Sequence, residues 1–261
     1  MKVAVITGAS SGIGLECAKL FSKNKYRVYA LSRRAGEDES IIHLKCDVTD
    51  EKQVEETFLK IFKNEGKIDV LVNNAGFGIS GAVEFTDEAQ AKKQFDVNFF
   101  GCFNCCKSVI KYMRKTGGGR IINISSMAAP LAIPFQAFYS ASKSAINSLT
   151  LSLANEVKPF GISVCAIMPG DVKTGFTAVR EKETKGEKEY GKVIEKSIAA
   201  MERDEQNGMS PETIAKAVLA TAQKKKVKPL STVGVQYKTF ALLSKVLPMS
   251  AVNKIVGMIY T

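Results

Sequence analysis

The chain has almost no histidine: His43 is the only one among its 261 residues, and tryptophan is absent. Histidine is the side chain that most often carries protons in enzymes near neutral pH. A site built from several histidines is therefore excluded. If the protein is an enzyme, another group has to act as its acid and base.

Long apolar runs are also missing. The nearest approach, residues 239–261, is interrupted by Lys245, Pro248, Asn253 and Lys254. Because a membrane-spanning helix needs about 20 apolar residues, we expect none. A strand-like pattern begins at Lys2, where the charged and apolar parts of a signal peptide would otherwise lie, so we expect no leader.

Six cysteines without a secretory leader favour reduced thiols and a cytoplasmic location. Cys102, Cys105 and Cys106 contain a C-x-x-C within a helical pattern, but no second pair of ligands accompanies them. We therefore expect buried or half-buried thiols at these positions and no metal site.

Basic residues outnumber acidic ones by 37 to 26, which gives a formal charge of +11. Such an excess is compatible with nucleic acid, a polyanionic small ligand or an anionic membrane surface as a partner. No nucleic-acid-binding motif is present, so we do not expect nucleic acid. The densest basic run, residues 223–229, is typical of a solvated helix end.

Apolar strand-like runs alternate with helical patterns. Strands are expected over residues 2–7, 26–32, 41–46, 67–74, 119–126 and 161–170, and helices over 14–24, 51–66, 88–115 and 142–158. The alternation predicts an α/β fold with a doubly wound parallel sheet, helices on both faces, and one domain over residues 1–261. Residues 33–40 are too few for a full crossover helix. Residues 171–209 are polar and are expected to form a substrate-loop insertion.

A glycine-rich turn, TGASSGIG at residues 7–14, links the first strand to the first helix. Gly8 allows a tight exit from the strand, Gly12 lets the backbone approach a diphosphate, and the helix N-terminus supplies free N–H groups. After the first strand of a βαβ unit, such a turn is a strong indication of a dinucleotide site.

The second strand ends in Ser32, Arg33 and Arg34, where an NAD-binding chain would carry an acidic residue; Glu37 comes several positions later. An arginine fork matches the oxygens of a 2′-phosphate, and Ser11 can add a hydroxyl. Two arginines in a surface loop of a basic protein are the alternative. We expect NADP(H) rather than NAD(H) as the cofactor.

The segment YSASK, residues 139–143, offers an acid–base group other than histidine. Its Tyr139 and Lys143 are four residues apart and share one face of a helix. A free tyrosine has a pKa near ~10, about three units too high for a neutral-pH acid or base, which is roughly 4 kcal/mol. An ammonium about 4 Å away, at an effective dielectric of about 20, supplies roughly that much to the phenolate. We therefore expect the pair to act as a general acid and base.

Seven motifs occur in order: TGASSGIG, CDV (46–48), NNAG (73–76), DVN (96–98), NISS (123–126), YSASK and PGDVKT (169–174). Over residues 2 to about 175 the chain resembles the short-chain dehydrogenase/reductase family, which implies a three-layer Rossmann fold. The resemblance implies that Tyr139 exchanges a proton with the substrate oxygen and that Lys143 lowers its pKa and holds the nicotinamide ribose. Ser126 would bind the carbonyl or hydroxyl, with Ser125 as its rival, and Asn98 would hold a water linking Lys143 to solvent.

The resemblance also implies a set of cofactor contacts, in which Asp47 meets the adenine, residues 74–76 pack near the ribose and residues 169–174 contact the nicotinamide amide. The expected cofactor-binding residues are Gly8, Ser10, Ser11, Gly12, Ile13, Gly14, Arg33, Asp47, Val48, Asn74, Ala75, Gly76, Tyr139, Lys143, Pro169, Gly170, Val172 and Thr174.

Within the family the chain is most similar to the 17β-hydroxysteroid and retinol dehydrogenase-type branch, which includes acyl-dihydroxyacetone-phosphate reductases. This implies interconversion of a ketone and a secondary alcohol on a steroid-, retinoid- or acyl-lipid-like substrate. The alternatives are a non-catalytic NADP(H)-binding sensor or scaffold, and a reductase of another small carbonyl such as a ketoacyl thioester. The resemblance further implies a homodimer or homotetramer, with helices 88–115 and 142–158 paired across a two-fold axis.

Residues 237–261 carry two amphipathic helical patterns separated by Pro248. These apolar faces could be buried in three ways. We expect first that they pack on the domain or on a dimer partner. The others are a small helical lid over a lipophilic pocket, formed with residues 171–209, and peripheral contact with a membrane surface.

Overall fold

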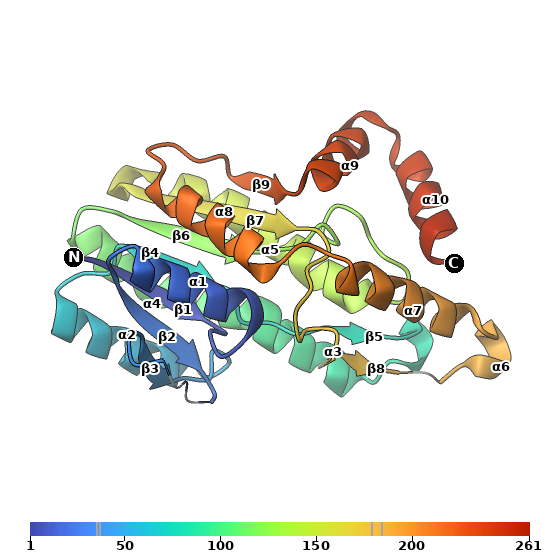
Figure 1. The fold of residues 1–261 in the computed structure, drawn as a ribbon, viewed down its shortest axis with the longest axis horizontal. Coiled ribbons are helices and arrows are strands. Elements are labelled where there is room, and N and C mark those ends of the chain that lie inside the picture. Colours follow the sequence, from blue (N-terminus) through green and yellow to red (C-terminus); the bar gives the residue numbers. More distant parts are fainter. Residues whose placement is uncertain (35, 37, 179, 184) are drawn as a thin grey trace.

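A seven-stranded parallel sheet forms the centre of the computed structural model, which describes residues 1–34, 36, 38–178, 180–183 and 185–261 (Figure 1). The strands lie in the order β3-β2-β1-β4-β6-β7-β9. All six strands expected from the sequence are present, and the doubly wound sheet is confirmed. The strand bounds are β1 Lys2–Thr7, β2 Tyr26–Ser32, β3 Ile42–Lys45, β4 Val70–Asn73, β6 Gly119–Ile124, β7 Ile162–Pro169 and β9 Leu230–Val233.

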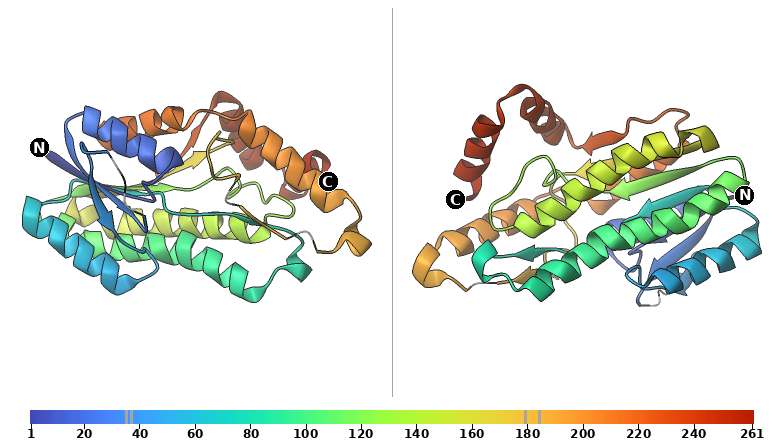
Figure 2. Two further views of the ribbon diagram at one scale, coloured as in Figure 1. Left: turned by 60° about the horizontal axis from the view of Figure 1, so that its bottom comes forward. Right: turned by 180° about the vertical axis from the view of Figure 1, so that it is seen from behind.

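Helices cover both faces of this sheet (Figure 2). One face packs against α2 Glu51–Glu65, α4 Gly101–Lys115 and α5 Ala137–Glu156, and the other against α1 Gly12–Lys23 and α8 Pro211–Gln223. Each face has its own buried core, around Phe58 in the first case and Phe21 in the second. The strand order reverses between β1 and β4, and such a reversal is where α/β sheets bind their ligands.

The long helix expected over residues 88–115 is interrupted by a single wide turn. The chain runs as α3 Glu88–Phe95, a π-helical turn η2 Asp96–Phe100, and then α4. The extra residue of a π-turn rotates the side chains that follow it, and such turns are frequent at functional sites. Asn98 lies inside this turn and is buried.

The start of α5 differs from the expected boundary, whereas the connection between β2 and β3 agrees with the expectation. The helix expected over residues 142–158 begins earlier, at Ala137, so that both Tyr139 and Lys143 are inside it. Among the described residues between β2 and β3 there is no helix, as the short spacing predicts. Glu37, the acidic residue that comes several positions after the end of the second strand, lies outside the described residues.

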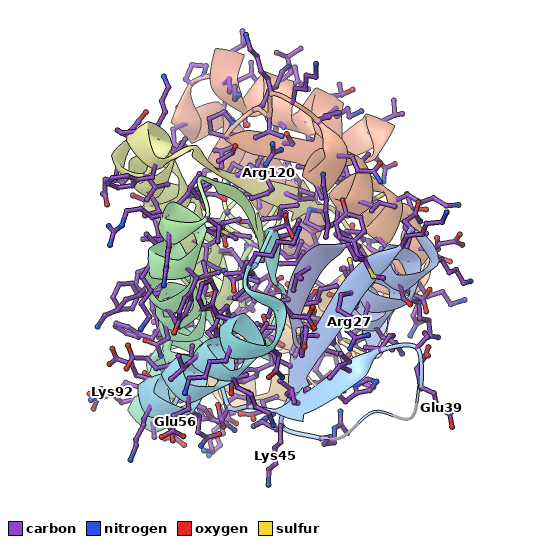
Figure 3. The ribbon with its side chains drawn as sticks, turned by 90° about the vertical axis from the view of Figure 1, so that its left-hand side faces the viewer. Arg27, Glu39, Lys45, Glu56, Lys92 and Arg120 are labelled. Carbon is purple, nitrogen blue, oxygen red and sulfur yellow. The ribbon has the colours of Figure 1, made fainter. Side chains whose placement is uncertain are left out.

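The basic residue Arg120 joins the sheet to α8. Its side chain is buried at the start of β6 and donates hydrogen bonds to the carbonyl oxygens of Thr221, at 2.7 Å, and Lys224, at 2.8 Å (Figure 3). These carbonyls belong to the end of α8, where a cation also complements the helix dipole. The contact holds α8 against the sheet.

Residues 171–209 leave the sheet at the carboxyl end of β7. They include β8 Glu181–Lys182, which pairs with β5 Ile79–Ser80, followed by α6 Glu187–Tyr190 and α7 Val193–Gln206. After β9 come α9 Val235–Val246 and α10 Met249–Tyr260, broken at Pro248 as predicted (Figure 1). Within the described residues, no helix has the length and apolar character needed to cross a membrane.

Candidate active site

A cavity of about 930 Å³ opens at the carboxyl ends of the central strands. Segments that are far apart in the sequence meet on its wall, because parallel strands bring their carboxyl ends to one edge of the sheet. Of the residues expected to bind substrate or cofactor, eighteen line this cavity and two, Gly14 and Asn98, do not. Those that line it are Gly8, Ser10, Ser11, Gly12, Ile13, Arg33, Asp47, Val48, Asn74, Ala75, Gly76, Ser126, Tyr139, Lys143, Pro169, Gly170, Val172 and Thr174.

The glycine-rich turn has the backbone shape that its sequence predicts. Gly8 and Gly12 have positive φ angles of 63° and 54°. A Cβ at Gly8 would lie 2.7 Å from the Cα of Ala75, and one at Gly14 would lie 2.4 Å from the carbonyl oxygen of Gly8. Gly14 therefore packs behind the turn and supports it, whereas Gly8 and Gly12 face the cavity.

The N-terminus of α1 is available to a ligand. Its first turn contains no acidic residue, and the side chain of Ser11 makes no capping hydrogen bond. Because first-turn N–H groups lack partners inside the helix and carry partial positive charge, this end of α1 fits a diphosphate.

Asn74 fixes the next segment of the wall to this turn. Its amide donates to the carbonyl oxygens of Thr7 and Gly8, at 3.1 Å each. The Thr7 hydroxyl in turn accepts from the backbone N–H groups of Asn74, at 3.0 Å, and Ala75, at 3.1 Å. Residues 74–76 are thus held rigidly beside the glycines.

Another part of the cavity wall is formed by residues that follow β2 and β3: Arg33, Arg34, Asp47 and Val48. The Asp47 carboxylate accepts hydrogen bonds from the backbone and the hydroxyl of Thr49, and Asn104 holds the carbonyl oxygen of Val48 at 3.0 Å. Arg33 and Arg34 are exposed on the wall. Two exposed guanidinium groups on this wall offer the cavity positive charge that suits an anion.

Tyr139 projects from α5 into the middle of the cavity. Burial is the main reason that its pKa is raised to about 12; hydrogen bonding with the Ser126 hydroxyl and the charge of Arg180 act in the opposite direction. The phenol is therefore protonated at neutral pH and is in the form that donates a proton.

Lys143 is buried one helical turn further along. Its Nζ donates to the carbonyl oxygen of Ile124 at 2.8 Å and lies 5.7 Å from the centre of the Tyr139 ring. Burial lowers the pKa of this lysine to about 8. The sequence argument expected Lys143 to lower the pKa of Tyr139 below its ordinary value. Instead, burial shifts both groups toward their neutral forms.

The low pKa of Lys143 gives a prediction about stability. Lowering a folded-state pKa from 10.5 to about 8 corresponds to roughly 3 kcal/mol of destabilisation near pH 7. The lost hydrogen bond to Ile124 offsets about 1 kcal/mol of it. We expect Lys143→Met to raise the free energy of unfolding by about 2 kcal/mol in urea denaturation at neutral pH.

The sign of this effect fixes its pH dependence. Between pH about 8 and 10.5 the unfolded parent chain binds more protons than the folded one, so the parent gains stability as the pH rises. The advantage of Lys143→Met should therefore shrink across that interval. Lys52→Met, which makes the same change at an exposed lysine, serves as the control. An advantage that is constant with pH would refute the burial argument.

The structure separates the two candidate serines. Both line the cavity. Ser126 interacts with the phenol of Tyr139 and accepts a hydrogen bond from the backbone N–H of Ala128 at 3.1 Å. Ser125 is buried and its hydroxyl donates to the carbonyl oxygen of Lys143 at 3.2 Å. Only Ser126 has its hydroxyl beside the phenol.

The side chain of Asn98 hydrogen-bonds to two neighbouring segments of the chain, and the water expected beside this residue stays a prediction. Its side-chain oxygen accepts from the N–H of Phe77 at 3.0 Å, and its NH₂ donates to the carbonyl oxygen of Phe77 and to the Ser142 hydroxyl. A Cβ at Gly76 would lie 3.0 Å from this oxygen and 3.7 Å from Nζ of Lys143. The asparagine side chain therefore connects the π-turn, residues 76–77 and α5 from behind the cavity wall.

Sequence reasoning missed several groups around Tyr139. The Phe176 ring lies 5.7 Å from the tyrosine ring, and Arg180, buried behind it, forms an ion pair with Glu205 of α7. Asp171 accepts a hydrogen bond from the Tyr237 hydroxyl at 2.6 Å. Asp171 belongs to the PGDVKT motif, but Phe176, Arg180, Glu205 and Tyr237 come from the rest of the 171–209 segment and from the tail, where no local motif marks them.

Three comparisons agree on the family. The short chain dehydrogenase family matches residues 2–185. A 3-ketodihydrosphingosine reductase from Bacteroides thetaiotaomicron is 41% identical over 227 residues, which cover 86% of this chain and 84% of that protein. An NADPH-dependent 1-acyldihydroxyacetone phosphate reductase from Saccharomyces cerevisiae is 35% identical over 191 residues, covering 69% of this chain and 64% of that protein. The solved structure of ElxO with NADP bound has a TM-score of 0.76 at 31% identity, covering 91% of this chain and 99% of that one.

The chain therefore belongs to the short-chain dehydrogenase/reductase family. Its fold is the Rossmann fold of that family, and its class is that of nicotinamide-dependent oxidoreductases acting on CH–OH or C=O groups.

Proposed function

We propose that the protein is an NADPH-dependent reductase that converts a long-chain lipid ketone to the secondary alcohol. One observation carries the proposal: the cavity that holds the glycine-rich turn and Tyr139 is also lined by apolar side chains of the tail, and we call this part of the cavity the chamber. The tail supplies much of the chamber lining, including Phe240, Leu243, Leu247, Val252, Val256 and Ile259. Apolar side chains in a concave site favour an apolar substrate. The names of the two relatives, both reductases of ketones that bear long chains, support the same substrate class.

The cleft at the other end of the cavity fits NADP(H). The N–H groups of α1 would hold the diphosphate, and Arg33 with Ser11 would hold the 2′-phosphate. Asp47 would meet the adenine, residues 74–76 the ribose, and Pro169, Gly170, Val172 and Thr174 the nicotinamide side. When bound, the nicotinamide supplies the hydride.

Tyr139 and Ser126 are the groups that would bind the ketone oxygen, and Tyr139 would donate the proton to it. In the proposed reaction both hydroxyls hydrogen-bond to the ketone oxygen, and the phenol gives up its proton as negative charge develops there. With its pKa raised to about 12, the phenol is protonated at physiological pH and can give a proton to the ketone oxygen. The guanidinium of Arg180 lowers the energy of the phenolate that remains. Lys143, charged below pH about 8, adds to that stabilisation.

Chain length of the substrate tests the proposal. NADPH consumption would be measured with a series of ketones that differ only in the length of one alkyl chain. Each buried CH₂ is worth about 0.8 kcal/mol, so kcat/KM should rise roughly two- to fourfold per added CH₂ until the chamber is full. Absence of turnover with every ketone, while NADPH binds, would refute the proposal, and a flat chain-length profile would remove the lipid substrate.

We also propose a homodimer through the outer faces of α4 and α5. Phe100 at the end of the π-turn, Phe103 on α4 and Leu151 on α5 are exposed there. Exposed aromatic and aliphatic side chains on adjacent helices are typical of an association surface. The cytoplasmic location expected from cysteine usage stays a prediction.

A further inference from the structure

The two tail helices are apolar on two sides. Their inner sides line the chamber and are anchored by Val252 and Val256, which are buried. Their outer sides carry a second apolar set that does not line the chamber. In Figure 1 and in the right view of Figure 2 the two helices stand above the body of the molecule. An amphipathic helix that served only as a cover would have a polar outer side.

The outer side is strongly exposed. Val235 is 83% exposed, Val246 74% and Met249 71%, and Leu242 and Met258 are similar. Of the sixteen exposed large apolar side chains among the described residues, nine belong to residues 235–261. Soluble proteins rarely collect such side chains in one place unless something covers them. We call Val235, Leu242 and Val246, which share one side of α9, the outer apolar face; Met249 and Met258 add exposed apolar side chains on two sides of α10.

The charges of this segment identify what could cover it. Residues 235–261 contain Lys238, Lys245 and Lys254 and no acidic residue. Lys238, Leu242, Lys245 and Val246 follow the spacing i, i+4, i+7 and i+8, so lysines and apolar side chains share one side of α9. This combination suits the boundary between anionic headgroups and acyl chains, where lysines extend to the phosphates. A second copy of the chain would instead place lysines against lysines.

We propose that the outer apolar face docks on an anionic phospholipid bilayer, with α9 and α10 lying in its interfacial layer. The same helices form the chamber wall, so docking would bring the chamber next to the bilayer, where lipid ketones reside. The route for substrate rests on the function proposed above; the docking itself does not.

Vesicle sedimentation tests the docking without substrate or cofactor. The full-length protein would be mixed with vesicles of phosphatidylcholine alone or of phosphatidylcholine with phosphatidylserine, and the bound fraction measured at low and high salt. We expect binding to the anionic vesicles, weakened by salt. Because each lysine near such a surface contributes about 1 kcal/mol, Lys245→Gln should weaken binding about fivefold.

Two matched variants test whether the apolar side chains themselves contribute to vesicle binding, apart from the effect of an added negative charge. Leu242→Glu, on the outer apolar face, should weaken vesicle binding at least tenfold. Leu59→Glu makes the same change at an exposed leucine of α2 and should leave binding unchanged. NADPH binding by each variant verifies that it is folded, and Lys254→Gln provides a second, milder test if Leu242→Glu does not fold.

Three results would overturn the proposal: no binding of the parent to anionic vesicles at low salt, equal binding by Leu242→Glu and Leu59→Glu, or a self-associated form in sedimentation velocity that Leu242→Glu dissociates. The last result would mean that a second copy covers the face. Failure to turn over any ketone would affect only the proposed function, because vesicle binding is measured without turnover.

Discussion

Replacing Tyr139 by phenylalanine is expected to lower ketone turnover roughly 10²–10⁴-fold while NADPH binding changes by less than about twofold. The substitution removes only the hydroxyl, so the ring keeps its contact with Phe176. Neither Ser126 nor Lys143 can replace the lost acid. Serine is too weak an acid, and Lys143 is directed toward the carbonyl oxygen of Ile124. The effect should therefore appear in kcat and kcat/KM together, which identifies an interaction of the transition state.

The measurement needs a control that removes a phenol elsewhere. Tyr190 donates its hydroxyl to Glu84 in a surface contact, and Tyr190→Phe should keep near-parental turnover. NADPH binding by Tyr139→Phe can be followed by fluorescence titration. Near-normal turnover in Tyr139→Phe would remove the tyrosine from the mechanism and return the search for the acid to the remaining cavity residues.

Replacing Arg33 by aspartate is expected to weaken NADPH binding about 100-fold and to change NADH binding little. Hydrogen bonds to charged groups contribute about 1.5–3 kcal/mol, and the new carboxylate would also repel the 2′-phosphate. NADH has no such phosphate, so its affinity should be nearly unaffected. The expected outcome is a change in the ratio of the two dissociation constants.

Arg34→Asp makes the same change of charge at the adjacent cavity residue and is the matched comparison. Its effect on NADPH should be smaller than that of Arg33→Asp. If both cofactors lose affinity equally in Arg33→Asp, the arginine does not read the phosphate. A larger effect at Arg34 would assign that role to the neighbouring side chain.

Much of the fold could be predicted because its signals are local. The buried strands are continuous apolar runs, the two tail helices separate where Pro248 cannot continue α9, and the glycines at positions 8 and 12 occupy positive φ angles. The edge strand β9 was missed because four residues carry little periodicity. It becomes a strand only by pairing with residues 166–169 of β7. The short β5–β8 pair escaped for the same reason.

The sequence by itself determined six of the strands, the glycine-rich turn and the placement of Tyr139 and Lys143 on one helical face, because each depends on neighbours within a few residues. The tertiary structure decided which serine meets the phenol, where the Asn98 side chain binds, and that Arg180 and Glu205 lie behind Phe176. It also reversed the expected pKa shift of Tyr139. Burial and long-range charge cause these effects. Both depend on which distant segments the fold brings together, and spacing along the chain does not contain that information.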